Sequence, residues 1–347
     1  MLNFVTLFNA NYLSRGLVLY HSLLKNCENF HLYVVAFDDA TYNYFQKNPL
    51  AHLTAIALSQ FEDDKLKAIK HTRSAAEYCW TSTPSTILYC ITKFNLPDCT
   101  YIDADMCFYA NPKVLIDEMG NNSVLITEHR YTKRYNQSLT SGKYCVQFVT
   151  FKNTEDGLIA LNWWREACID WCYNRFEDGK FGDQKYLDKW PIQFKGVHEL
   201  QHLGGGIAPW NVQQYHFTQN NSKLKGTELL SNKQFEVVFF HFHSLKFFEN
   251  DIVLLCDTGY DLNKNVISIF YSNYIKDILL QNEQVIKTTP NLNANGIFGP
   301  ANYLPMSLAT VKQYYLENIR SSKKNSFGTK LFKQIKNHYY FYLSNFK

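Results

Sequence analysis

The sequence lacks the features that mark several classes of protein. No apolar run approaches the roughly 18 unbroken residues of a membrane-spanning helix, so we expect no such helix. The nine cysteines are scattered without a C-x-x-C pair, which argues against a zinc site or a disulfide framework and predicts free thiols. Charged residues make up only 19% of the chain and apolar residues 46%, a composition that excludes a disordered protein and supplies a large core.

An excess of charge of one sign is also missing from most of the chain. The 347 residues carry a formal net charge of +4, but six lysines and no acidic residue follow Ser321. Subtracting these six charges leaves −2 for residues 1–320, which argues against broad nucleic-acid binding. We therefore expect no nucleic-acid partner and a positive field confined to the C-terminal tail.

The two ends of the sequence bear on targeting. Residues 1–8 have no basic segment before their apolar run and no small-residue cleavage site, so we expect no signal peptide and a cytoplasmic protein. The tail, residues 330–347, interleaves Lys330, Lys333 and Lys336 with aliphatic and aromatic residues, a pattern typical of a helix at a membrane surface. It predicts peripheral membrane contact, with a terminal helix packed on the core as the alternative.

Strand-like and helix-like segments alternate along the chain. Short apolar runs predict strands, and stretches with apolar residues three and four positions apart predict helices. This alternation predicts an α/β fold with a mostly parallel central sheet flanked by helices, in which ligands bind at the carboxyl ends of the strands. We expect a catalytic domain over residues 1–250 and a helical C-terminal extension over residues 251–347. The expected strands are residues 3–8, 31–37, 53–58, 100–103, 123–127, 144–151 and 235–243; the expected helices are residues 14–24, 63–78, a further helix that begins at Pro84, 160–175 and 263–284.

The most specific local motif is Asp103-Ala104-Asp105, at the end of a predicted strand. Two carboxylates in this arrangement offer hard oxygen ligands to a divalent cation, which can bridge the two phosphates of a nucleotide. The alternative is that one of them caps the next turn or helix. The motif therefore predicts a metal site that depends on what else lies nearby.

Two histidines, His241 and His243, lie two residues apart in a predicted strand. Alternate residues of a strand point to the same face, so either imidazole can complete a metal shell with the aspartate pair. A hydrogen-bonded core histidine is the alternative for each.

Two glycine-containing segments are further candidates. Gly204-Gly205-Gly206 lets the backbone approach a ligand, so its amides are predicted to meet phosphate or sugar oxygens, with a tight loop as the alternative. Asp183 and Gln184 follow Gly182 and bring a carboxylate and an amide to a turn, with an ordinary helix cap as the alternative for Asp183.

Taken in order, these motifs resemble the GT-A nucleotide-sugar glycosyltransferases, especially the glycogenin and bacterial lipopolysaccharide galactosyltransferase type. The resemblance spans residues 3–245, and its specificity lies in the order of several motifs that are weak when separate. The segments that carry it are Val5-Thr6-Leu7-Phe8-Asn9 with Tyr12, Asp103-Ala104-Asp105, Asp183-Gln184, Pro209-Trp210-Asn211-Val212 and His241-Phe242-His243.

The resemblance implies roles for individual residues. Asp103 and Asp105 look like the metal-binding pair, with His241 as the third ligand and His243 as its near competitor. Asp183 and Gln184 match the pair that faces the transferred sugar. The remaining donor-binding positions implied by the resemblance are Phe8, Asn9 and Tyr12 around the nucleotide base, Arg73 and Glu77 on a donor-contacting helix, and Lys246; a surface ion pair is the alternative for Arg73 with Glu77. Ala104, inside the aspartate motif, and Gly205, in the glycine segment, are further donor-binding candidates.

The sequence departs from the family pattern in two places. Ser244-Leu245-Lys246-Phe247 stands where the family follows its final histidine with Gly and then Lys-Pro-Trp, and Lys246 is the expected substitute for the phosphate-binding lysine. Cys145-Val146-Gln147 replaces the Asn-x-Gly common in the mid-chain strand, which predicts a different geometry on the acceptor side.

The function implied is transfer of a hexose from a UDP-sugar to a hydroxyl of a glycan or lipid-linked glycan acceptor in bacterial surface polysaccharide synthesis. Mn²⁺ or Mg²⁺ would neutralise the departing diphosphate. If the reaction inverts configuration, Asp183 is the candidate base, and if it retains configuration, Gln184 or a backbone carbonyl stabilises the sugar cation. The alternatives are a haloacid-dehalogenase-like phosphatase with Asp103 as nucleophile, and a catalytically dead sugar-nucleotide-binding protein.

Overall fold

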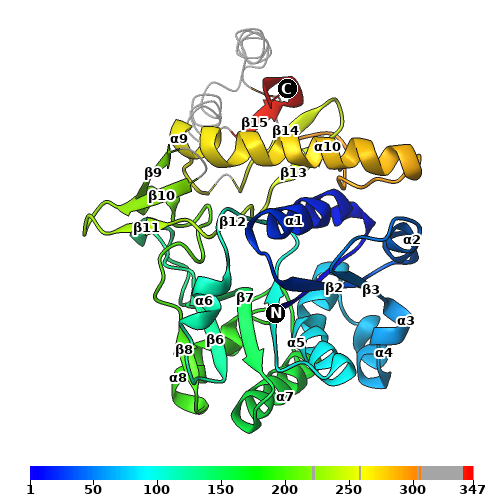
Figure 1. Cartoon of the computed structure of the whole chain (residues 1–347), viewed down its shortest axis with the longest axis vertical. Coiled ribbons are helices and arrows are strands. Elements are labelled where there is room, and N and C mark those ends of the chain that lie inside the picture. The colour runs from blue at the N-terminus through cyan, green and yellow to red at the C-terminus, as the bar shows by residue number, and fades with distance from the viewer. Residues whose placement is uncertain (221–222, 258, 303–304, 306–338, 347) are drawn as a thin grey trace, which may run out of the picture.

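The central element of the computed structural model is a seven-stranded sheet in the order β3-β2-β1-β4-β7-β6-β8 (Figure 1). The structure describes residues 1–220, 223–257, 259–302, 305 and 339–346. Neighbouring strands of the sheet run parallel except β7, which is antiparallel to both β4 and β6. The predicted α/β class with a mostly parallel central sheet is therefore confirmed. The strands are β1 (Leu2–Phe8), β2 (Phe30–Ala36), β3 (Leu53–Ala57), β4 (Asp98–Ile102), β6 (Val124–Glu128), β7 (Tyr144–Lys152) and β8 (Val197–Glu199).

Helices cover both faces of this sheet. On one face, α5 and α7 bury Ile87, Ile91 and Trp164 against the strands; on the other, α1 and α2 bury Leu17 and Phe45. Because both faces are covered, the strands consist largely of apolar residues instead of alternating with polar ones. The α-helices are α1 (Leu13–Asn26), α2 (Asp39–Lys47), α3 (Leu58–Phe61), α4 (Asp64–Lys70), α5 (Ala75–Phe94), α6 (Lys113–Asp117), α7 (Glu155–Asp170), α8 (Trp190–Gln193), α9 (Lys264–Val266) and α10 (Ser272–Thr288), and the short 3-10 or π segments are η1 (Ala10–Tyr12), η2 (Lys133–Tyr135), η3 (Lys185–Lys189), η4 (Val212–Gln214), η5 (Ile267–Tyr271) and η6 (Leu343–Phe346).

The helix break expected at Pro84 is wrong. The chain breaks earlier, between α4 and α5, and Pro84 lies inside α5. The hydroxyls of Thr81 and Thr83 donate to the carbonyls one turn earlier, at 2.8 and 3.2 Å, near the position where Pro84 lacks its N–H. Burial of this part of α5 against the sheet outweighs the hydrogen bond that proline removes.

Three smaller sheets complete the fold. The predicted single strand over residues 235–243 is divided, because β11 joins one sheet and β12 pairs with β5 in another. The strands of these sheets are β5 (Met106–Phe108) with β12 (Phe239–His241); β9 (Tyr215–Asn220), β10 (Lys223–Glu228) and β11 (Gln234–Glu236); and β13 (Lys246–Phe248), β14 (Ile252–Leu254) and β15 (Tyr340–Tyr342).

The part of the chain after residue 250 contributes both helices and strands. The helix predicted over residues 263–284 is present as the consecutive segments α9, η5 and α10. Helix α10 packs alongside α1, as Figure 1 shows. Strands β14 and β15 pair antiparallel at the C-terminal end. No helix within the described residues is long and apolar enough to cross a membrane. The nine cysteines are free thiols, as expected.

The predicted membrane-surface helix is wrong over residues 339–346. These residues form β15 and η6, and Tyr339, Tyr340, Leu343 and Phe346 are buried in the core, so their rings do not form an apolar surface for lipid. Lys330, Lys333 and Lys336 lie outside the described residues.

The start of α5 generates a test of local stability. Ser74 and Glu77 form a reciprocal cap: the Ser74 hydroxyl accepts from the Glu77 N–H at 3.3 Å, and the Glu77 carboxylate accepts from the Ser74 N–H at 2.8 Å. We expect Ser74→Ala to lower the free energy of unfolding by about 1 kcal/mol, measured by urea denaturation. Ser59→Ala, on the exposed part of α3, is the control and should change it by less than about 0.5 kcal/mol.

Candidate active site

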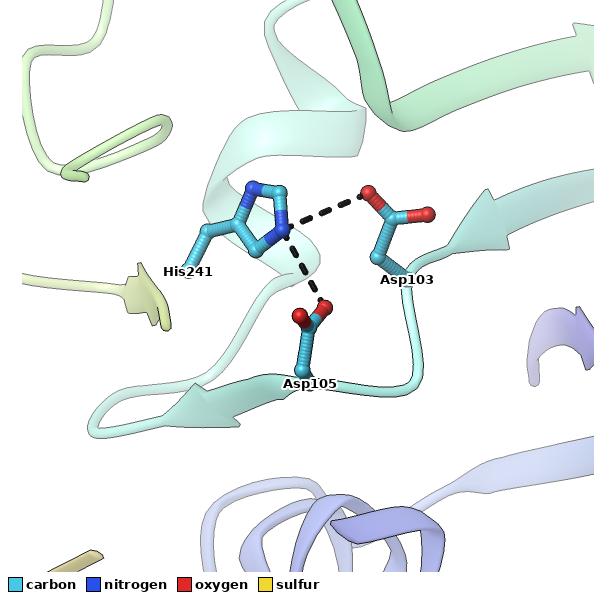
Figure 2. Close-up of side chains that lie close together, drawn as sticks. All are labelled: Asp103, Asp105 and His241. Atoms are coloured by element: carbon cyan, nitrogen blue, oxygen red, sulfur yellow. Dashed lines mark ion pairs between the residues drawn. The ribbon is translucent and has the colours of Figure 1, made fainter. Parts of the chain in front are cut away.

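Three ligand-type side chains converge beyond the carboxyl end of β4 (Figure 2). His241 Nε2 lies 3.1 Å from Asp105 Oδ1 and 3.6 Å from Asp103 Oδ2. The three side chains each offer one ligand atom, and these atoms lie within 4.8 Å of one another. Two carboxylates and one imidazole are a donor set that suits a divalent cation such as Mn²⁺. The predicted aspartate pair and strand histidine are thus brought together by the fold.

The backbone fixes this triad from two sides. Strand β12 pairs with β5 so that His241 lies opposite Met106, the residue after Asp105. The Phe242 N–H donates to the Asp105 carbonyl at 2.9 Å, and the Asp103 N–H donates to the Gln147 carbonyl at 3.2 Å. The triad is therefore held by strand pairing and not by flexible loops alone.

The charges of the triad are strongly coupled. Burial raises the pKa of Asp103 to about 6; the positive charge of His241 opposes this rise, and the negative charge of Asp105 adds to it. Burial also opposes ionisation of Asp105, but the contact with His241 outweighs it and lowers the pKa of Asp105 to about 2. Against its own burial, His241 is held protonated, with a raised pKa, by Asp105. In the metal-free protein the imidazolium therefore occupies the place of a cation.

His243 lies apart from this group. Its side chain is exposed, its ring centre is 5.6 Å from that of His241, and it also contacts the Trp210 ring at 5.5 Å. Within the described residues, the cluster of ligand atoms contains His241 and not His243. The geometry therefore favours His241 as the third ligand.

Gln147, which the sequence indicated only as part of a departure from the family pattern, contacts the triad. Its side chain is fully buried, and its Oε1 accepts from His241 Nδ1 at 2.6 Å. Trp210 packs edge-on against the His241 ring, with ring centres 5.5 Å apart, and its indole N–H and the Asn211 amide both donate to the His129 carbonyl at 2.9 Å. The signal for Gln147 in the sequence is a long amide inside an apolar strand.

Asp183 is a buried acid close enough to Asp103 for their charges to interact. Burial, reinforced by the neighbouring charge of Asp103, raises the pKa of Asp183 to about 8. It is not the cap of the following helical turn, because the residue at that position is Gln184, whose side chain makes no capping bond. Gln184 Nε2 instead donates to the Ser141 carbonyl at 2.7 Å. Asp183 is thus a protonated carboxyl near the triad, and Gln184 braces a loop.

The three residues expected around a nucleotide base differ in exposure. Phe8 is only 3% exposed and packs on Phe45 and against Gly16, where a Cβ would lie 2.3 Å from its ring, so its ring is not available for stacking. Asn9 caps η1 by accepting from the Asn11 N–H. Tyr12 is 39% exposed, so of the two predicted rings it is the one at the surface.

The glycine segment adopts its tight-loop alternative. Gly204 and Gly205 are buried, and a Cβ on Gly204 would lie 1.9 Å from the Glu236 carbonyl oxygen. A Cβ on Gly205 would lie 2.6 Å from Leu200. Close packing therefore explains these glycines without a bound phosphate, contrary to the expectation for Gly205.

Arg73 and Glu77 do not pair with each other in the described part of the chain. Arg73 stacks over the Tyr173 ring at 4.0 Å and hydrogen-bonds to its hydroxyl, and Glu77 accepts from the Asn174 N–H at 2.8 Å. Both therefore brace the loop after α7. Lys246 is exposed on β13, with its ammonium 5.7 Å from the Phe298 ring centre.

Comparisons with known proteins give relatives of two kinds. No protein-family model matches the chain. The uncharacterized proteins YfnD and YfnF of Bacillus subtilis (strain 168) are 28% identical over 309 residues (87% of this chain, 96% of YfnD) and 29% identical over 248 residues (69% of this chain, 80% of YfnF). Among solved structures, the chain is similar to the galactosyltransferase LgtC in complex with donor and acceptor sugar analogs, at 12% identity and a TM-score of 0.47 over 80% of this chain and 96% of that one. It is also similar to mouse xyloside xylosyltransferase 1, at 12% identity and a TM-score of 0.40 over 60% and 87%.

The buried Asp183 carboxyl predicts an unusual pH dependence of stability in the metal-free protein. Its pKa is about 8 when folded and 3.8 ordinarily, so the unfolded chain releases this proton at lower pH and the carboxyl destabilises the fold increasingly from about pH 4 to pH 8. We expect Asp183→Asn to be more stable than the wild type at pH 8 by at least about 1 kcal/mol, the linkage value of one pKa unit. Urea denaturation at several pH values measures the difference, which should shrink towards pH 4; parallel pH profiles would contradict a buried protonated acid.

Proposed function

We propose that this chain is a metal-dependent glycosyltransferase that moves a hexose from a UDP-sugar to a hydroxyl group of a glycan acceptor. The observation that carries the proposal is the convergence of Asp103, Asp105 and His241 at a strand end. The order of motifs that resembles the GT-A glycosyltransferases supports it. In this proposal residues 1–250, which contain the central sheet and the triad, form the catalytic domain, and residues 251–347 form an extension.

The donor set fits a cation that carries a diphosphate. The carboxylates of Asp103 and Asp105 are 29% and 14% exposed, so they are partly shielded from water yet open to a ligand. A bound Mn²⁺ or Mg²⁺ would supply charge neutralisation for the departing UDP. In the metal-free protein, His241 must release its extra proton before its Nε2 can act as a ligand, and Asp103 and Asp105 must be ionised.

The neighbouring residues fit the sugar and its acceptor. Asp183 is near enough to Asp103 for their charges to interact, and we propose that it faces the transferred sugar. Aromatic rings stack well on the apolar faces of sugars. Tyr131 and Tyr260, half-buried beside Trp210, are the rings that we propose for the acceptor glycan.

The proposed donor, acceptor and place of action follow from the resemblance. A glycan or lipid-linked glycan of bacterial surface polysaccharide is the proposed acceptor class. A cytoplasmic location fits both a UDP-sugar donor and nine free thiols.

The experiment that tests the whole proposal is a panel of UDP-sugars assayed for UDP release, with Mn²⁺ or Mg²⁺ and with excess chelator. Release of UDP that persists in chelator would contradict the proposal. Phosphate release from simple phosphomonoesters would instead indicate the phosphatase alternative.

The triad predicts a large loss of activity on removal of one carboxylate. We expect Asp105→Asn to lower kcat/KM by about 100- to 1000-fold, the usual cost of losing one electrostatic contact to the developing charge. Asp117→Asn, which changes an exposed acid paired with Lys113 on α6, is the matched control and should retain activity.

The two strand histidines are separated by the same assay. His241→Ala should lower kcat/KM far more than His243→Ala; equally mild effects would mean that neither is a ligand.

The exposed Tyr12 ring predicts a contribution to nucleotide binding. We expect Tyr12→Ala to weaken UDP binding by about 1 kcal/mol, the energy typical of an aromatic pair, measured by calorimetry. Tyr342→Ala removes a ring of the same 39% exposure on β15 and should leave UDP affinity unchanged. Equal affinity for UDP, ADP and GDP in the wild type would argue against a uracil pocket at Tyr12.

A further inference from the structure

Gln147 contacts the metal triad at two points although it is not a ligand. It lies in the middle of β7, is completely buried, and is flanked by β4 and β6. Its side-chain Oε1 accepts from His241 Nδ1 at 2.6 Å, and its backbone carbonyl accepts from the Asp103 N–H at 3.2 Å. One residue of the central sheet therefore orients a ligand from each of the two segments that build the site.

The chemistry of imidazole gives the Oε1 contact a specific consequence. His241 Nε2 faces Asp103 and Asp105, so Nε2 must offer a lone pair if a cation is to bind between the three side chains. A neutral imidazole with a free Nε2 carries its proton on Nδ1, and Gln147 Oε1 is the acceptor placed for that proton. An acceptor at Nδ1 fixes the tautomer and the ring orientation that a metal ligand needs.

We propose that Gln147 is a positioning residue that holds His241 in its metal-binding tautomer, an inference that rests on the proposed metal-dependent function. Gln147 is not itself a ligand in this proposal. The species bound by the triad is a divalent cation, and Gln147 affects its binding only through His241.

The cost of burying this amide argues against a mere packing role. Gln147 Nε2 has no hydrogen-bond partner among the described residues and is not exposed to water. A buried donor without a partner is unfavourable, and an apolar side chain of the same length would avoid the cost. The other half of the amide, Oε1, makes the contact that offsets it.

Gly206 lies beside the Gln147 amide. Its φ of +104° lies in the region that favours glycine, and a Cβ there would lie 3.4 Å from Gln147 Nε2 and 3.0 Å from Thr127 Cγ2. The backbone conformation at residue 206 therefore favours glycine, and the loop that follows β8 packs beside the Gln147 side chain.

The test measures metal affinity directly and does not need a sugar donor. The probe is Mn²⁺ alone, titrated into the full chain, with free Mn²⁺ counted by electron paramagnetic resonance. Gln147→Met keeps the length of the side chain but removes the acceptor, and we expect it to weaken Mn²⁺ binding about 10- to 100-fold, as is typical when the partner of a metal-bound histidine is lost. Gln147→Glu keeps an acceptor at the same place, and we expect Mn²⁺ affinity equal to or greater than that of the wild type.

A control on the same strand separates positioning from stability. Thr150, also buried in β7, shares a hydrogen bond of 2.8 Å with Thr100 and does not contact the triad. Thr150→Val should lower the melting temperature without changing Mn²⁺ affinity. Circular dichroism and the melting temperature show whether each Gln147 variant is folded; should Gln147→Glu not fold, the comparison of Gln147→Met with Thr150→Val decides.

Three results would overturn the proposal. They are wild-type Mn²⁺ affinity in a folded Gln147→Met variant, an equal loss of affinity in folded Gln147→Met and Gln147→Glu variants, and a wild-type chain that binds no Mn²⁺. The last result would also remove the metal-dependent function. Mn²⁺ binding with no UDP release from any UDP-sugar would instead refute the glycosyltransferase and leave the role of Gln147 standing.

Discussion

The antiparallel pairing of β5 with β12 is the constraint on which the site depends. It joins two segments far apart in the sequence, with Phe108 opposite Phe239 and Met106 opposite His241. Phe239 stacks on Phe148 of β7, so the short ladder is anchored to the central sheet by a buried aromatic contact. Without this pairing, nothing in the backbone would hold His241 beside the aspartates. The two carboxylates that follow β4 would then lack its positive charge.

The second organising fact is an excess of buried negative charge. The charge of Asp103 acts on both Asp105 and Asp183. In the metal-free protein His241 pairs with Asp105 at 3.1 Å and with Asp103 at 3.6 Å, and Asp183 keeps its proton. Burying like charges together is unfavourable, and proteins commonly accept that cost where a ligand later offsets it. A divalent cation would be the ligand that this arrangement favours most. The same electrostatics that destabilise the metal-free site would therefore provide its affinity for a cation.

Much of this arrangement was predictable from the sequence, for identifiable reasons. The strand-end position of Asp103 and Asp105 and the strand pattern around His241 are local features that periodicity predicts. Their joint role as ligands was implied by the resemblance in motif order, and the choice of His241 over His243 required the three-dimensional geometry. The burial of Phe8 depends on Gly16 and Phe45, the glycine segment is explained by the Glu236 carbonyl, and the aromatic tail pairs with β14; each depends on a residue distant in sequence. Pro84 shows the same limit, since tertiary burial overrode a local helix-breaking signal.

The departure of Cys145-Val146-Gln147 from the Asn-x-Gly pattern acquires a physical meaning from the structure. Gln147 occupies the position of the pattern's glycine, and a glycine there would leave His241 Nδ1 without the acceptor at 2.6 Å and would open a void beside Gly206. The difference therefore lies behind the proposed metal ligands, Asp103, Asp105 and His241. Because the tautomer of a ligating histidine is set by the partner of its other nitrogen, a chain that changes this partner must supply a new acceptor or lose metal affinity. The long amide of Gln147, buried at the cost of an unpaired N–H, is the form that this acceptor takes here.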